Sequence, residues 1–214
     1  SEMAASRRAL FLLPFGAVMI LAFGFTTLGP TLAWAIPRLA WWEASLLAVA
    51  PFLAVVAAGL PLGRAGDRSG HGRVLLLGLV LLPAGLALPL AGGSFPVLLA
   101  AFTVMGLSSI AISAAANPLV AGLFPERLGS SLTLLHVGWS AGAFAGPVTA
   151  GLLLAGGDPR SLFALAAGLG SLFLAAAAPL SRTLPGPPAA GPRREFRLTT
   201  PLLLLVLLGF FYSG

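Results

Sequence analysis

The run GRAGDRSGHGR, at residues 63–73, decides the fold, because it is a short charged stretch between two long apolar segments. Five of its eleven side chains can carry a charge, whereas only 8% of the whole chain is charged and 58% is hydrophobic. Soluble domains carry about 25% charged residues. We therefore expect a membrane protein in which this run is a loop outside the bilayer.

Apolar segments surround this run on both sides. A helix needs about 20 mostly apolar residues to cross the hydrocarbon core of a bilayer. The segments that meet this length are 9–36, 44–62, 74–92, 96–123, 131–155 and 161–180. A seventh begins at Pro201, but its stretch to Gly214 would reach only about 21 Å. The expected fold is an all-α integral membrane protein, with a six-helix bundle and a seventh helix in which the chain is truncated.

The basic residues predict how the chain is oriented. All twelve are arginine, and the six segments place ten of them on one side of the membrane, with only Arg38 and Arg160 on the other. Loops rich in basic residues stay in the cytoplasm. We therefore expect a multi-pass protein of the inner (plasma) membrane with a cytoplasmic N-terminus. This placement explains the basic charge without a nucleic-acid partner. The outer end would carry Trp34, Trp41 and Trp42 as interfacial anchors.

Composition changes along the chain predict four parts. Residues 1–8 hold Ser1-Glu2, which is typical of a tag remnant ahead of Met3, and a cytoplasmic N-terminus. Residues 9–180 form the six-helix domain. Residues 181–200 are rich in Pro, Gly and Arg and read as a cytoplasmic linker. Residues 201–214 begin the seventh helix.

The chain lacks the residue patterns of catalysis. It has no cysteine, which excludes disulfides, thiolate nucleophiles and cysteine-ligated metals. It has no HExxH, no GxSxG and no paired carboxylates. We expect neither an enzyme nor a bound cofactor or metal.

Polar side chains nevertheless recur at helical spacing within three apolar segments. They are Thr27 and Thr31 around Pro30, Ser109, Ser113 and Asn117 in 96–123, and Thr133, His136, Trp139 and Ser140 in 131–155. Polar groups in membrane helices are costly unless they face a partner or a water-filled cavity. The alternative for each serine or threonine is a bond to a carbonyl of its own helix. His136 is the ionisable side chain deepest in these segments, and Trp139 offers a flat face that suits a sugar ring.

Glycine has two expected uses. Gly63 and Gly66 would end the second helix, beside Asp67, which we expect to accept backbone N–H bonds or to pair with Arg73 or a neighbouring arginine. Further along, small residues recur every fourth position in one helix and would let it pack closely on a neighbour. This ridge consists of Gly138, Gly142 and Gly146, followed by Pro147.

The spacing G-x-x-x-D-R-x-G-x-x-R within residues 63–73 resembles the signature loop of the major facilitator superfamily of transporters. The resemblance implies two six-helix halves, each built from three-plus-three inverted repeats, of which the C-terminal half is missing from this chain. It also implies that the loop latches the halves together as a cytoplasmic gate, the alternative being that its arginines only fix the topology. The gate residues implied are Gly63, Gly66, Asp67, Arg68, Gly70 and Arg73. The glycine ridge also resembles a motif of the family's antiporters.

Residues 113–147 resemble a narrower branch, the fucose/glucose–proton symporters, through AANP at 115–118, LTLLH at 132–136 and S-x-G-A at 140–143. The acidic residues of that branch are absent here, where Thr31 and Ser113 stand instead. In the superfamily, helices 1, 4 and 5 line the cavity. The implied substrate-binding residues are His136, Trp139, Asn117, Ser113, Thr27 and Thr31.

These patterns predict a secondary active or facilitative transporter that moves a small polar solute by alternating access. A sugar is the first expectation, with a proton or sodium as possible coupling ion. Two alternatives stay open. One is an efflux carrier for lipophilic compounds, which the nearly uncharged helices favour. The other is a six-helix scaffold or half-transporter that needs a partner chain.

Overall fold

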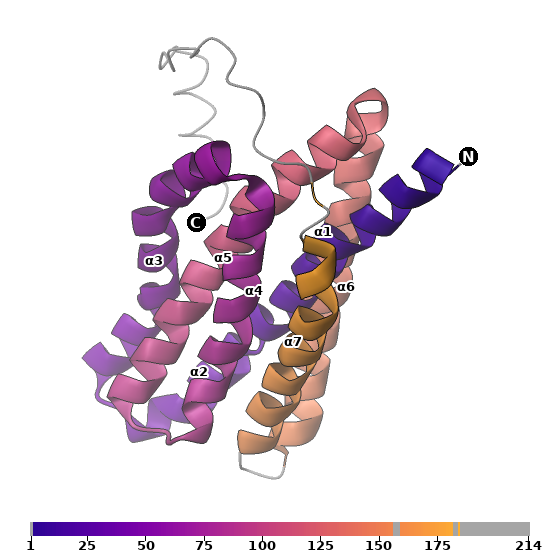
Figure 1. Ribbon diagram of the computed structural model, residues 1–214. Helices are drawn as coiled ribbons and strands as arrows, with labels where there is room; N and C mark the ends of the chain where they lie inside the picture. Colours follow the sequence, from indigo (N-terminus) through magenta and orange to yellow (C-terminus); the bar gives the residue numbers. More distant parts are fainter. Residues whose placement is uncertain (1, 156–158, 182–183, 185–214) are drawn as a thin grey trace.

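The computed structural model describes residues 2–155, 159–181 and 184, and its regular elements in this part of the chain are all helices (Figure 1). The elements are α1 (Glu2–Thr26), α2 (Leu28–Ala35), η1 (Ile36–Arg38), α3 (Trp41–Ser69), α4 (His71–Ala87), η2 (Leu88–Leu90), α5 (Phe95–Leu123), η3 (Pro125–Arg127), α6 (Leu128–Leu154) and α7 (Arg160–Ser181).

Six of the spans in the described ranges are long and apolar enough to cross a membrane, which confirms the predicted fold class. They are Ala9–Arg38, Trp41–Ser69, His71–Leu90, Phe95–Leu123, Pro125–Leu154 and Arg160–Leu180. Almost all of the predicted linker at 181–200, and the whole predicted partial helix at 201–214, lie outside the described residues.

The charged run at 63–73 differs from its prediction. The sequence predicts a loop that begins where Gly63 and Gly66 end the second helix, and this prediction is wrong. Helix α3 continues to Ser69, whose hydroxyl donates to the Ala65 carbonyl at 2.7 Å. The chain reverses at Gly70 alone, with φ 93°, a conformation that glycine adopts without a steric penalty. Helix α4 begins at the next residue, so the charged run is two helix ends joined by one glycine.

The first span is interrupted near its outer half. Helix α1 ends at Thr26 and α2 begins at Leu28, two residues before Pro30. Proline has no backbone N–H, so the carbonyl one turn before it loses its helical partner. The hydroxyls of Thr26 and Thr27 donate to carbonyls of the preceding turn, Ala22 and Gly24, at 2.7 and 2.6 Å. The predicted disruption around Pro30 is therefore local, and the span continues past it.

The core of the bundle forms where α1, α4 and α5 meet. Its fully buried side chains include Leu21 of α1, Leu75 and Leu79 of α4, and Met105 and Ile112 of α5. Helix α4 packs against α5 and α7, α3 packs on α5, and α1 packs on α6. In Figure 1, α3 and α6 lie toward opposite sides of the bundle. These two helices are the least buried of the six spans, so they present broad outward faces.

A hydrogen bond between two helices fixes the register of α4 and α5. The fully buried Ser108 hydroxyl donates to the Gly78 carbonyl at 2.9 Å. Most hydroxyls in these helices bond to their own backbone instead. The α4–α5 pair is thereby tied together directly beside the position from which α5 contributes to the site.

Candidate solute-binding site

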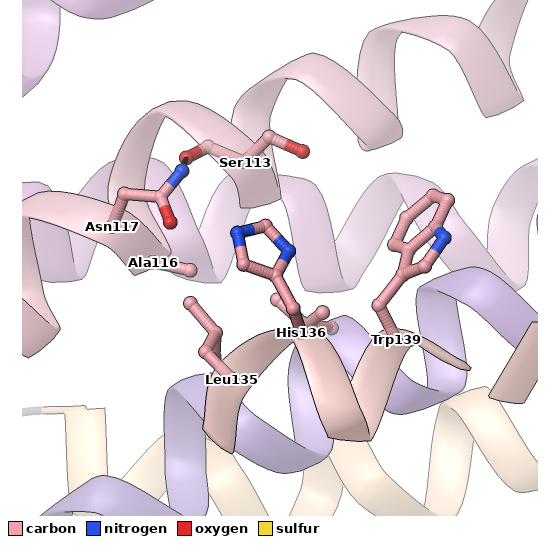
Figure 2. Close-up of a pocket in the computed structure, with 7 residues that line it drawn as sticks. Ser113, Ala116, Asn117, Leu135, His136 and Trp139 are labelled. Carbon is pink, nitrogen blue, oxygen red and sulfur yellow. Dashed lines mark hydrogen bonds between the residues drawn. The ribbon is translucent and has the colours of Figure 1, made fainter. Parts of the chain in front are cut away.

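A pocket of about 250 Å³ lies among α1, α5 and α6 (Figure 2). Four of the six substrate-binding residues predicted from the sequence line it. The full lining is Val18, Ser113, Ala116, Asn117, Leu135, His136 and Trp139. The structure thus brings residues about twenty positions apart in the sequence to the two facing walls of one cavity.

Helix α5 contributes the amide wall. Ser113 and Asn117 stand one turn apart, which places them on the same face of the helix. The Asn117 amide nitrogen donates weakly to the Ser113 carbonyl, at 3.4 Å. In Figure 2 the Asn117 side chain faces the His136 ring across the pocket. Asn117 is exposed, so its amide is accessible to a solute.

Helix α6 contributes the aromatic wall. His136 and Trp139 are three residues apart, and both rings rise from α6 toward α5 (Figure 2). His136 is exposed and Trp139 is half-buried. Within the described residues, neither ring nitrogen of His136 nor the indole nitrogen of Trp139 has a hydrogen-bond partner in the protein. The pocket therefore presents unpaired polar atoms beside a flat apolar surface.

Helix α1 contributes an apolar residue instead of the predicted threonines. Thr27 and Thr31 are fully buried, and neither lines the pocket. Their hydroxyls donate to the carbonyls of Gly24 and Thr27, at 2.6 and 2.8 Å. This is the self-bonding arrangement that the sequence left open for such residues. Val18 lines the pocket from α1, and nothing in its sequence context distinguishes it from other core residues.

The remaining polar positions of α6 also bond within their own helix. Thr133 donates to the Gly129 carbonyl at 2.9 Å, and Ser140 donates to the His136 carbonyl at 3.0 Å. Both residues are exposed, but neither lines the pocket. The side chains that face the cavity from α6 are therefore Leu135, His136 and Trp139.

The charged run lies away from this pocket, at the junction of α3 and α4. Asp67 does not pair with Arg73 or another arginine, as its chemistry predicts, but lies with Oδ1 3.8 Å from Nε2 of His71. The two residues are one helical turn apart across Gly70, because α3 continues far enough to place Asp67 there. Arg64, Asp67 and Arg68 are all exposed, so the end of α3 carries an accessible charged face.

The glycine ridge of α6 is buried against α1. A Cβ atom on Gly142 would overlap the carbonyl oxygen of Met19, and one on Gly146 would overlap the hydroxyl of Thr26. The backbones of α6 and α1 can approach this closely only because these positions lack side chains. The ridge therefore packs within this bundle and also holds the wall that carries His136 and Trp139.

Comparisons with known proteins agree with this architecture. The family model described as Major Facilitator Superfamily matches residues 10–214, nearly the whole chain. A search of curated proteins finds no significant match.

Proposed function

The chain belongs to the major facilitator superfamily and is a membrane transporter, and we propose that it carries a small polar solute, with a sugar as the leading substrate class. The observation that carries this proposal is the pocket itself. It places the flat face of Trp139 beside the hydrogen-bonding groups of Asn117, Ser113 and His136. Such a combination matches a solute that has an apolar ring face and a polar rim.

The size of the pocket supports a small solute. Pockets for drug-sized ligands are about 300–1,000 Å³, and this one is about 250 Å³. Its outer side is open, since His136 and Asn117 are both exposed. We infer that residues 9–180 form the N-terminal half of the transporter and that a second six-helix half completes the site.

Alternating access between two such halves would expose the solute to each side of the membrane in turn. The broad apolar faces of α3 and α6 support this inference. Phe52 and Val56 of α3, and Val137 and Phe144 of α6, are more than half exposed. In the same arrangement the exposed charges at the end of α3 would serve as the cytoplasmic latch, with residues 181–200 as the linker between the halves and the N-terminus in the cytoplasm.

Residues 113–147 favour the fucose/glucose–proton symporter branch within this proposal. The segments that carry the resemblance, AANP at 115–118 and LTLLH at 132–136, contribute Asn117 and His136 to the two facing walls. The family match itself extends only to the superfamily. The branch therefore rests on these residues alone.

The test is uptake by proteoliposomes that hold the full open reading frame containing this chain. We expect saturable uptake from a panel of labelled sugars, and loss of that uptake in His136→Ala. Thr133→Val is the matched control, because Thr133 lies one turn away on α6 and bonds only to its own helix. Uptake that is equally reduced in both variants would show that the loss reflects helix packing rather than solute contact.

A second function is favoured by the apolar part of the lining. Val18, Ala116, Leu135 and Trp139 make up most of the wall, and none of the lining residues is acidic. An efflux carrier for lipophilic compounds would use such a surface. If well-folded protein takes up no sugar but lowers the accumulation of a lipophilic dye in cells, this second function replaces the first.

A further inference from the structure

The pocket combines hydrogen-bond donors with a complete lack of carboxylates among its lining residues. We propose that the preferred solute is a sugar acid or related hydroxy acid in its carboxylate form, carried together with one proton held on His136. This inference rests on the proposed function, since it specifies the charge of the solute and the coupling ion of the same site.

The acidic side chains that the structure describes with their contacts all lie at helix ends and have partners there. Glu43 accepts the backbone N–H of Ala40 at 2.8 Å, Glu126 lies 3.9 Å from Arg7, and Asp67 lies beside His71. None of them lines the pocket. A cationic solute would therefore find no counter-charge on this half of the site, and burial of an unpaired charge is costly.

The surroundings of His136 leave it as the one titratable group of the pocket. Helix α1 faces it with Val18, and α6 places Leu135 and Trp139 beside it. The groups from α5 are a serine, an alanine and an asparagine, at positions 113, 116 and 117. None of these side chains titrates in the physiological range, whereas histidine ordinarily changes charge between about pH 5 and pH 8. A proton taken up inside this pocket would be held by the imidazole.

The donors of the pocket suit a carboxylate better than a hydroxyl. A carboxylate only accepts hydrogen bonds, and both of its oxygens can be used at once. The Asn117 amide, the Trp139 indole N–H and a protonated His136 all donate. Hydrogen bonds in which both partners are charged are about twice as strong as neutral ones. The ring of a sugar acid would still use the face of Trp139.

The charge balance explains why the proton and the solute would travel together. The imidazole takes up one proton from the side on which the solute binds and releases it on the other side, and no other bond forms or breaks. The carboxylate and the imidazolium are neutral as a pair, which lowers the cost of moving either charge through a low-dielectric interior. The empty site returns with a neutral imidazole, so one turnover carries one anion and one proton.

The experiment compares three solutes that share one ring: neutral glucose, anionic glucuronate and cationic glucosamine. Proteoliposomes holding the full open reading frame are given an inward proton gradient. We expect glucuronate uptake to exceed the other two and to rise with the gradient. In His136→Gln the preference for glucuronate over glucose should fall about tenfold, as expected for loss of a charged hydrogen bond. His136→Arg should still exchange glucuronate but no longer respond to the gradient, because its charge is permanent.

Three results decide against this inference in different ways. A preference for glucose over glucuronate at every pH between about 5 and 8 overturns it and leaves the sugar transporter in place. A gradient response that survives in His136→Gln overturns the role of the imidazole. If folded protein transports none of the three solutes, the proposed function fails together with the inference. Elution as a single species in detergent shows that each variant is folded, and Thr133→Val should keep the response of the parent protein.

Discussion

The imidazole of His71 occupies the space that a side chain on Gly66 would fill. A Cβ atom on Gly66 would lie 2.5 Å from Nδ1 of His71. This contact connects the last turn of α3 to the first turn of α4, and it holds the ring within 3.8 Å of Asp67. The two helix ends are thus locked together by a glycine and a histidine on either side of Gly70.

Gly66→Ala should therefore destabilise the α3–α4 junction. The added methyl group has to displace the imidazole, and overpacking of this kind costs about 1–3 kcal/mol. The measurement is the free energy of unfolding in detergent. Gly63→Ala is the matched control, because it lies one turn earlier on α3 with nothing within 4 Å of its Cβ position. Equal effects of the two substitutions would contradict the contact.

Gly142→Ala should loosen the pairing of α6 with α1. Its Cβ would overlap a backbone carbonyl, that of Met19, which cannot move aside as a flexible side chain can. We expect a loss of stability of about 1–3 kcal/mol and a drop in transport, since α6 carries one wall of the pocket. Gly151→Ala, on the same helix and without a neighbour within 4 Å, should leave the unfolding transition unchanged.

Trp139→Ala should raise the KM for the transported solute about tenfold, because a pocket aromatic supplies both area and a flat face. Trp139→Phe keeps a ring and should restore much of the affinity. Trp41→Ala provides the comparison, since that indole is 82% exposed at the other end of the bundle from the charged run. The initial rate of uptake at several solute concentrations separates KM from the maximal rate. A KM that does not change in Trp139→Ala would remove this ring from the site.

The proposed orientation can be tested with single cysteines, because the chain has none of its own. Ser45 and Ser130 are both exposed and lie near opposite ends of their spans. In intact cells a membrane-impermeant maleimide should label Ser45→Cys and leave Ser130→Cys unlabelled. Permeabilised cells should show both labelled. The reverse pattern would place the N-terminus outside.

The number of spans could be predicted from the sequence because each is an uninterrupted apolar run of sufficient length. The two walls of the pocket were also predictable, since Ser113 and Asn117 repeat at one helical turn and His136 and Trp139 share a face. The end of the second helix was not. Charge and glycine content suggest a loop there, yet only the positive φ of Gly70 breaks the helix.

The hydroxyl partners show a different limit. Thr31 and Ser108 have similar apolar surroundings in the sequence, but Thr31 donates to its own helix and Ser108 donates across to Gly78. Which carbonyl is within reach depends on where two helices cross, and one sequence does not contain that distance. The role of Val18 in the pocket depends on the same crossing geometry.

The single-residue junction at Gly70 has a mechanical consequence. A long loop absorbs relative movement of the helices it joins, but one residue leaves no slack. Any tilt at the end of α3 must therefore pull on α4, which is bonded through Gly78 to Ser108 of α5. Helix α5 carries Ser113 and Asn117 only one and two turns further along. The charged end of α3 and the amide wall of the pocket are the two ends of one lever.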